Sequence, residues 1–145
     1  DNATPSGNGT LMGVLSRLYY LTGEDSYRAR AESIEKAFAG EVARNFFPLS
    51  TLINSSELMR RALQIVVLGD PSDPEVKALL AAIGHHSLPN RILSIVQSPD
   101  TLPQTHPAAG KTQLGAQATA YVCKGTVCSA PVTSSEELDR LLQGA

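Results

Sequence analysis

The chain has 145 residues, 42% of them hydrophobic and 18% charged, and a formal net charge of −2. This composition excludes a disordered chain, and the length suits one ordinary domain or two small ones. Its twelve lysines and arginines are scattered along the chain, which has three phenylalanines, four tyrosines and no tryptophan. Without a basic stripe or interleaved aromatic residues, nucleic acid is excluded as a partner.

No segment of the sequence predicts a membrane span or a signal peptide. Apolar runs such as Ile65 to Leu68 are far shorter than the roughly 20 residues that cross a bilayer. No basic segment is followed by an apolar one of signal-peptide length. We therefore expect a soluble protein, no membrane partner and a cytoplasmic location. The start at Asp1, without a methionine, suits a piece of a longer protein whose targeting information would lie elsewhere.

The first 62 residues predict three helices. Each helical segment has apolar residues at helical spacing, namely Leu11, Val14, Leu15, Leu18 and Leu21, then Tyr27, Ala31, Ile34 and Phe38, then Leu49, Leu52, Ile53 and Met59. Thr22-Gly23 separates the first two helices, which should form an antiparallel hairpin, and Pro48 suits the first turn of the third. Three helices make a thin bundle. The apolar residues on the outside of this bundle need to be covered by more protein, either the rest of a longer chain or a second copy.

From residue 63 onward the pattern is that of an α/β protein. Leu63 to Gly69 is short and almost continuously apolar, as in a strand covered on both faces. Asp73 is placed as the N-cap of a helix that has Pro74 in its first turn. Arg91 to Val96 predicts a second strand, so this β–helix–β unit should form a parallel pair with a right-handed crossover.

The remaining residues predict a long loop, a hairpin and a final helix. Residues 98–115 contain three prolines and two glycines without periodicity. The strand 118–123 follows, then a turn, a short return strand at 127–128 and a helix 136–143 capped by Ser134 or Ser135. The fold class is therefore mixed α/β. A helical segment, 1–62, precedes a small α/β domain, 63–145, with a parallel-type sheet of about three strands and flanking helices.

Cys123 and Cys128 lie on either side of the predicted turn and come within disulfide range if they face each other on a hairpin. Three interpretations stay open. They are two small buried thiols, a structural or switchable disulfide, or part of a metal site. His106, in the long loop, is the histidine that would join such a metal cluster, whereas His85-His86 ends a helix. Ordinary surface histidines account for all three, and we expect neither a metal nor a cofactor.

Two polar turns are candidates for binding. Gly69-Asp70-Pro71 lies between a strand and a helix, where α/β sheets bind phosphate. The glycine pattern of such sites is missing and the prolines remove amide donors, so a capping turn is favoured. The opening residues 1–8 are rich in polar groups. There Ser6 or Asn8 is expected to cap the first helix.

The chain resembles the C-terminal part of the spermatogenesis-associated, thioredoxin-domain-containing proteins (the YyaL type). The resemblance runs almost from end to end and rests on these strings: Asp1-Asn2-Ala3-Thr4-Pro5-Ser6-Gly7-Asn8, Leu21-Thr22-Gly23, Ile65-Val66-Val67-Leu68-Gly69-Asp70, Ala120-Tyr121-Val122-Cys123, Cys128, Pro131 and Glu137-Leu138. It implies an N-terminal thioredoxin-like domain, absent from this chain, and an α/α toroid similar to acylglucosamine epimerases and six-hairpin glycosidases. This chain would supply the last toroid helices and a small α/β end.

The residues and the resemblance together leave three hypotheses of function. The first is a non-catalytic terminal module whose partner is the rest of its own chain, with a homodimer when isolated. The second is part of a carbohydrate-active enzyme, in which Asp1, Ser6 and Asn8 would line the toroid cavity. A glycosidase needs a second carboxylate and an epimerase usually needs histidines, so no catalytic residue is assigned. The third is a redox-responsive module that uses Cys123 and Cys128.

Overall fold

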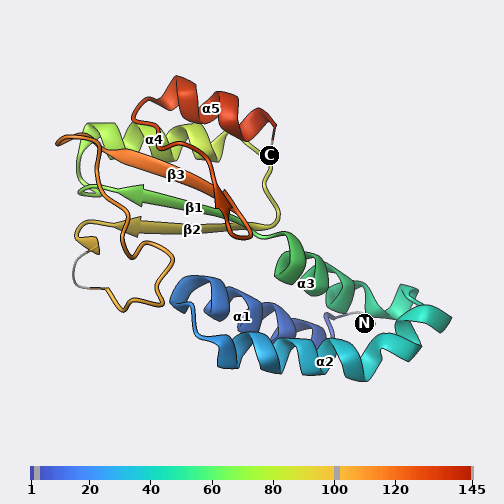
Figure 1. Ribbon diagram of the computed structural model, residues 1–145. Helices are drawn as coiled ribbons and strands as arrows, with labels where there is room; N and C mark the ends of the chain where they lie inside the picture. The colour runs from blue at the N-terminus through green and yellow to red at the C-terminus, as the bar shows by residue number, and fades with distance from the viewer. Residues whose placement is uncertain (2–3, 100–101, 145) are drawn as a thin grey trace. The chain divides into compact units, whose positions relative to one another are not determined.

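The computed structural model describes residues 1, 4–99 and 102–144. They form two compact units, Asp1–Ala62 and Leu63–Ala145, each with apolar core residues of its own (Figure 1). Among the described residues, none of the helices has both the length and the apolar character that crossing a bilayer requires.

The first unit is helical, as expected. It consists of α1 (Gly7–Thr22), α2 (Asp25–Arg44), the short 3-10 helix η1 (Phe47–Leu49) and α3 (Ser50–Arg61). Ser6 caps α1, because its Oγ accepts a hydrogen bond from the Gly9 amide, and Gly23 ends the helix in the left-handed region with φ 74°. Pro48 lies in η1 rather than in α3, so the third helix begins one short turn later than predicted.

The helices of the first unit share a small apolar core. Figure 1 shows α1 and α2 side by side as a hairpin, and α1 also packs along α3. The buried members of this core are Met12, Leu15, Ala31, Leu52 and Met59. In α2, which has 20 residues, Ala31 is the buried one. The second helix therefore presents most of its surface to solvent.

The second unit is a four-stranded mixed sheet with two helices. Its elements are β1 (Leu63–Leu68), α4 (Pro74–Gly84), β2 (Arg91–Val96), β3 (Thr119–Lys124), β4 (Val127–Cys128) and α5 (Ser135–Gln143). The strand order is β2-β1-β3-β4. As predicted, β1 and β2 are parallel.

The sheet is mixed rather than of parallel type, because β3 runs antiparallel to β1. Val96, at the end of β2, pairs with Leu68, and Thr119, at the start of β3, pairs with the same Leu68. The long loop thus begins and ends at one end of the sheet, and β3 has to run back. A parallel strand would need a crossover to the opposite end.

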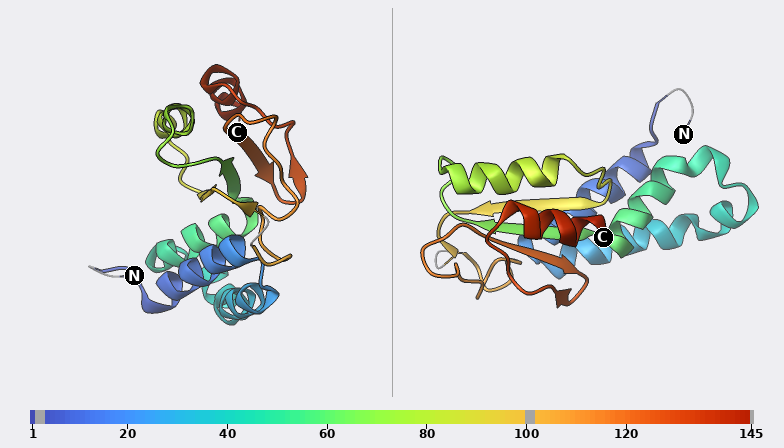
Figure 2. Two further views of the ribbon diagram at one scale, coloured as in Figure 1. Left: turned by 90° about the vertical axis from the view of Figure 1, so that its left-hand side faces the viewer. Right: turned by 90° about the horizontal axis from the view of Figure 1, so that it is seen from above.

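Different parts of the chain cover the two faces of the sheet. Alternate residues of β1, Ile65 and Val67, join α4 and α5 in one core, and Figure 2 shows these two helices side by side on that face. The other residues, Val66 and Leu68, pack with the fully buried Ala108 of the long loop. This burial on both sides explains the continuous apolar run of β1.

Candidate functional site

Asp1 connects the opening segment to the start of α3. One carboxylate oxygen, Oδ1, accepts a hydrogen bond from the Ser6 amide. The other, Oδ2, accepts a bond of 2.7 Å from the Ser50 hydroxyl and a second from the Thr51 amide. Because the first amides of a helix lack partners within it, the carboxylate caps α3 from a distant part of the chain. The structure thus brings Asp1 and Ser6 together in capping roles, and Asn8 is an exposed residue in the first turn of α1.

A surface groove of about 540 Å³ adjoins this capping site. Its lining residues are Asp1, Phe46, Phe47, Pro48, Ser50, Ile53 and Asn54. Phe46 and Phe47 are 65% and 82% exposed. An exposed apolar surface therefore lies beside a carboxylate and an amide. Sequence periodicity does not reveal this combination, because the two phenylalanines fall between the α-helices α2 and α3.

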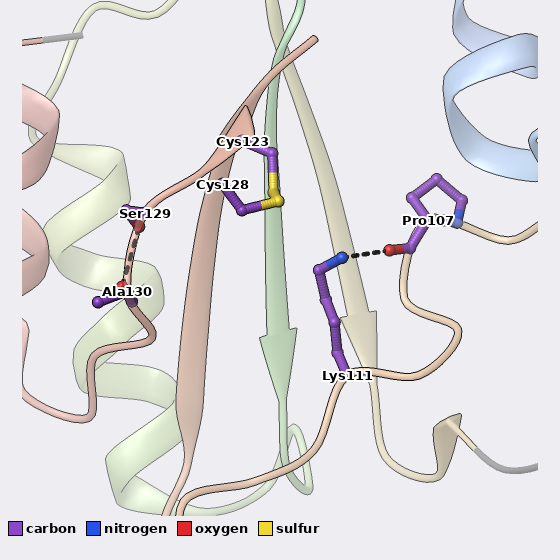
Figure 3. Close-up of a disulfide and its surroundings, with 6 residues drawn as sticks. All are labelled: Pro107, Lys111, Cys123, Cys128, Ser129 and Ala130. Carbon is purple, nitrogen blue, oxygen red and sulfur yellow. Dashed lines mark hydrogen bonds between the residues drawn. A yellow bond between two sulfur atoms is a disulfide. The ribbon is translucent and has the colours of Figure 1, made fainter. Parts of the chain in front are cut away.

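Cys123 and Cys128 form a disulfide between β3 and β4 (Figure 3). They are directly opposed in the antiparallel register, and opposed residues have Cβ atoms close enough to be bridged. Gly125, with φ 59°, makes the tight turn between them. The two halves differ in access, since Cys123 is 5% exposed and Cys128 is an exposed residue.

Lys111 reaches from the long loop across the face of the sheet that carries Cys123. Its Nζ donates a hydrogen bond of 2.7 Å to the Pro107 carbonyl oxygen and lies 5.6 Å from the centroid of the Tyr121 ring. Figure 3 shows the side chain ending at the Pro107 carbonyl oxygen. Partial burial lowers the pKa of Lys111. The loop therefore holds a cation against the sheet.

The histidines have separate local partners. His106 Nδ1 accepts a hydrogen bond of 3.0 Å from the Ala108 amide, and burial, followed by the charge of Lys111, lowers its pKa. His86 Nε2 lies 2.7 Å from Asp139 Oδ1, which connects the end of α4 to α5. That hydrogen bond lowers the pKa of Asp139. In the part of the chain that the structure describes, no three or more histidine, cysteine or acidic residues gather in a way that would hold a metal ion.

The turn after β1 is held together by hydrogen bonds to the Asp70 carboxylate. Asp70 Oδ1 accepts hydrogen bonds from the Ser72 amide (2.8 Å) and hydroxyl (2.7 Å), and these bonds lower the pKa of Asp70. Gln97, which follows β2, donates a bond of 2.8 Å to the other oxygen of Asp70. Asp73 occupies the N-cap position of α4, as predicted, but its side chain makes no capping hydrogen bond.

These features define the class of protein: a mixed α/β chain with one helical unit and one sheet unit, in which a disulfide joins β3 to β4. No family model and no solved structure matches it. Three similar proteins are spermatogenesis-associated protein 20 of Homo sapiens (30% identical over 98% of this chain), that of Rattus norvegicus (29%, also over 98%) and the uncharacterized protein B0495.5 of Caenorhabditis elegans (27% over 97%). The human and rat homologues confirm the resemblance to the spermatogenesis-associated proteins. The chain spans 18 to 20% of the length of these relatives.

Proposed function

We propose that the chain is a non-catalytic C-terminal module of a longer thioredoxin-domain-containing protein of the toroid type, in which its first unit supplies the last toroid helices. The observation that carries this proposal is an apolar stripe on α1, formed by Leu11, Val14 and Leu21, which are 49%, 49% and 38% exposed. Their spacings of three and seven residues put them on one face of the helix. We call this face the α1 stripe.

The α1 stripe has the properties of a surface made for another helix. The other sides of α1 already pack against α2 and α3, so the stripe is additional apolar surface. Contiguous exposed apolar patches mark sites of association in soluble proteins. The length of the relatives, about five times that of the chain, supports the rest of a longer protein as the occupant, with a second copy of the chain in its place when the chain is isolated.

Light scattering tests this proposal on the 145-residue chain. We expect a concentration-dependent dimer, which the double change Leu11→Gln and Leu21→Gln weakens by about tenfold or more through loss of buried apolar area. Leu114→Gln, at a 44% exposed leucine of the second unit, is the matched control and should leave the dimer unchanged. A monomer at all concentrations would contradict the dimer, and measurable turnover of sugars or disulfide substrates by the chain alone would contradict a non-catalytic role.

A second candidate function is a redox-responsive module, which is supported by the disulfide between Cys123 and Cys128. One half of the pair is exposed, so a reductant has access to it. Counting free thiols before and after mild reduction and reoxidation tests this candidate. Two thiols that appear and disappear reversibly would support it, and a pair that stays unchanged would end it.

The carbohydrate-active alternative is supported by the groove beside Asp1. Exposed aromatic rings such as Phe46 and Phe47 offer the flat apolar surface on which sugar rings stack, and Asn54 offers hydrogen-bonding groups. The test is Asp1→Ala in the full-length protein. A loss of sugar binding would favour this alternative, and unchanged binding would count against it.

A further inference from the structure

The two sulfur atoms of the disulfide differ in their surroundings. Cys123 lies within β3 and is buried, whereas Cys128 lies in the two-residue edge strand β4, where both residues are exposed. Thiol–disulfide exchange requires an incoming thiolate to reach one sulfur directly, so access decides which sulfur is attacked. Cys128 is the accessible one.

The hairpin has other connections that persist when the disulfide opens. The Ser129 amide donates a hydrogen bond of 2.8 Å to the Val122 carbonyl oxygen, and Ala120 and Val132 exchange two backbone bonds of 2.8 and 3.0 Å. The disulfide closes a loop of only five residues in sequence, and short loops gain the least stability from a cross-link. The pair therefore adds little as a staple, and its opening leaves the segment that leads to α5 in place.

Lys111 places a positive charge on the side of the sheet where Cys123 lies. Alternate residues of a strand share a face, so Tyr121 and Cys123 are neighbours on one face, about 6.8 Å apart along the strand. The Lys111 ammonium group lies 5.6 Å from the centroid of the Tyr121 ring and points to the Pro107 carbonyl oxygen (Figure 3), so its charge is held on the face that Tyr121 shares with Cys123. A nearby lysine stabilises a thiolate relative to the thiol.

We propose that the disulfide is a thiol-exchange site in which a thiolate attacks the sulfur of Cys128 and the sulfur of Cys123 leaves as a thiolate on the sheet face that also carries the Lys111 charge. This inference rests on the redox-responsive candidate. In the first step a bond forms between the incoming sulfur and Cys128 Sγ, the Cys123–Cys128 bond breaks, and its electron pair stays on Cys123 Sγ. A second thiolate then releases Cys128 as a thiolate, so that two thiols are oxidised to a disulfide and the protein pair is reduced.

Glutathione is a suitable probe for the direction of attack. The oxidised chain is mixed with limiting glutathione, quenched with N-ethylmaleimide and digested with trypsin. Cleavage after Lys124, which lies between the cysteines, separates them on two peptides for mass spectrometry. We expect glutathione on Cys128 and the maleimide on Cys123. This pair of labelled peptides should be about tenfold or more abundant than the pair with the labels reversed. An equal or reversed distribution would overturn the direction of attack while leaving the redox-responsive candidate standing.

The contribution of Lys111 is measured as the rate at which thiols appear. Lys111→Gln should slow the appearance of thiols by about three- to tenfold, because the thiolate loses stabilisation. Lys111→Arg keeps the positive charge and should retain most of the parent rate. Lys124→Gln is the matched control, because this lysine follows Cys123 directly but faces the opposite side, where its Nζ lies 3.5 Å from the Gly144 carbonyl oxygen. Equal slowing by both glutamine variants would overturn the role of Lys111. A folded chain that releases no thiol would overturn both this inference and the redox-responsive candidate.

Discussion

The hydroxyl group of Ser55 donates a hydrogen bond of 2.8 Å to the carbonyl oxygen of Gly9, which joins α3 to α1 across 46 residues of sequence. This contact requires the two helix backbones to lie unusually close together. A Cβ atom added at Gly9 would lie 2.7 Å from the Leu52 amide nitrogen, and one added at Gly13 would lie 2.8 Å from Ser55 Oγ. Gly9 and Gly13 of α1 therefore serve helix packing.

Replacing Gly9 with alanine should destabilise the first unit by about 1–3 kcal/mol, because the new methyl group overlaps rigid backbone atoms of α3. Urea unfolding measures the change. Gly40→Ala is the control, since nothing lies within 4 Å of its added Cβ, and it should stabilise α2 by about 0.5–1 kcal/mol. Equal effects at the two glycines would refute close packing of α1 on α3.

Asp1→Ala should cost about 1–2 kcal/mol, because the Thr51 amide and the Ser50 hydroxyl lose their acceptor at the start of α3. Hydrogen exchange of the Thr51 amide gives a direct readout and should become faster in the variant. Asp73→Ala, at an N-cap whose side chain makes no capping bond, should change stability by less than about 0.5 kcal/mol. Unaltered exchange at Thr51 would be incompatible with capping by Asp1.

Tyr20→Phe should destabilise the first unit by about 1 kcal/mol. The Tyr20 hydroxyl donates a hydrogen bond of 2.6 Å to the Met59 carbonyl oxygen, and burial raises the pKa of this tyrosine. Removal of the hydroxyl leaves that carbonyl without its partner. Tyr27→Phe changes the same group at another half-buried tyrosine and should have the smaller effect in thermal unfolding. A larger loss from the Tyr27 variant would contradict this assignment.

The stability of the second unit should depend on pH through Asp139. The hydrogen bond from His86 lowers the pKa of this carboxyl below its ordinary value of 3.8, so the folded state favours the ionised form. The resulting stability is present above pH 3.8 and is lost as the pH falls through the lowered pKa. Asp139→Asn should therefore lower the Tm at about pH 5, and the difference from the parent should shrink below about pH 4. Asp25→Asn is the control. A Tm difference between Asp139→Asn and the parent chain that grows toward acid pH would contradict the pairing of His86 with Asp139.

Most of the elements can be predicted from sequence because their patterns are local. The strand at 91–96 and the return strand at 127–128 agree with the structure residue for residue. The first helix begins at Gly7, after Ser6, which is one of its two predicted caps. In each case short-range periodicity or capping chemistry determines the element, and no distant residue is needed to recognise it.

The contacts that build the candidate sites are long-range, and the sequence does not predict them. The cap from Asp1 to Thr51 spans 50 residues and the pair His86–Asp139 spans 53, and neither spacing has a sequence signal. The prediction of a parallel-type sheet is wrong for β3, because its direction depends on where the long loop returns to the sheet. For Cys123 and Cys128 the spacing alone leaves free thiols, a disulfide and a metal site open, and the register of β3 and β4 favours the disulfide.

Association of the chain with the rest of the longer protein is the most direct test of the proposed module. The 145-residue chain and the remaining portion, produced separately, are mixed and analysed by sedimentation. A one-to-one complex is expected, weakened about tenfold or more by Leu11→Gln with Leu21→Gln and unaffected by Leu114→Gln. Failure to associate, or a complex that is indifferent to the α1 stripe, would contradict the account.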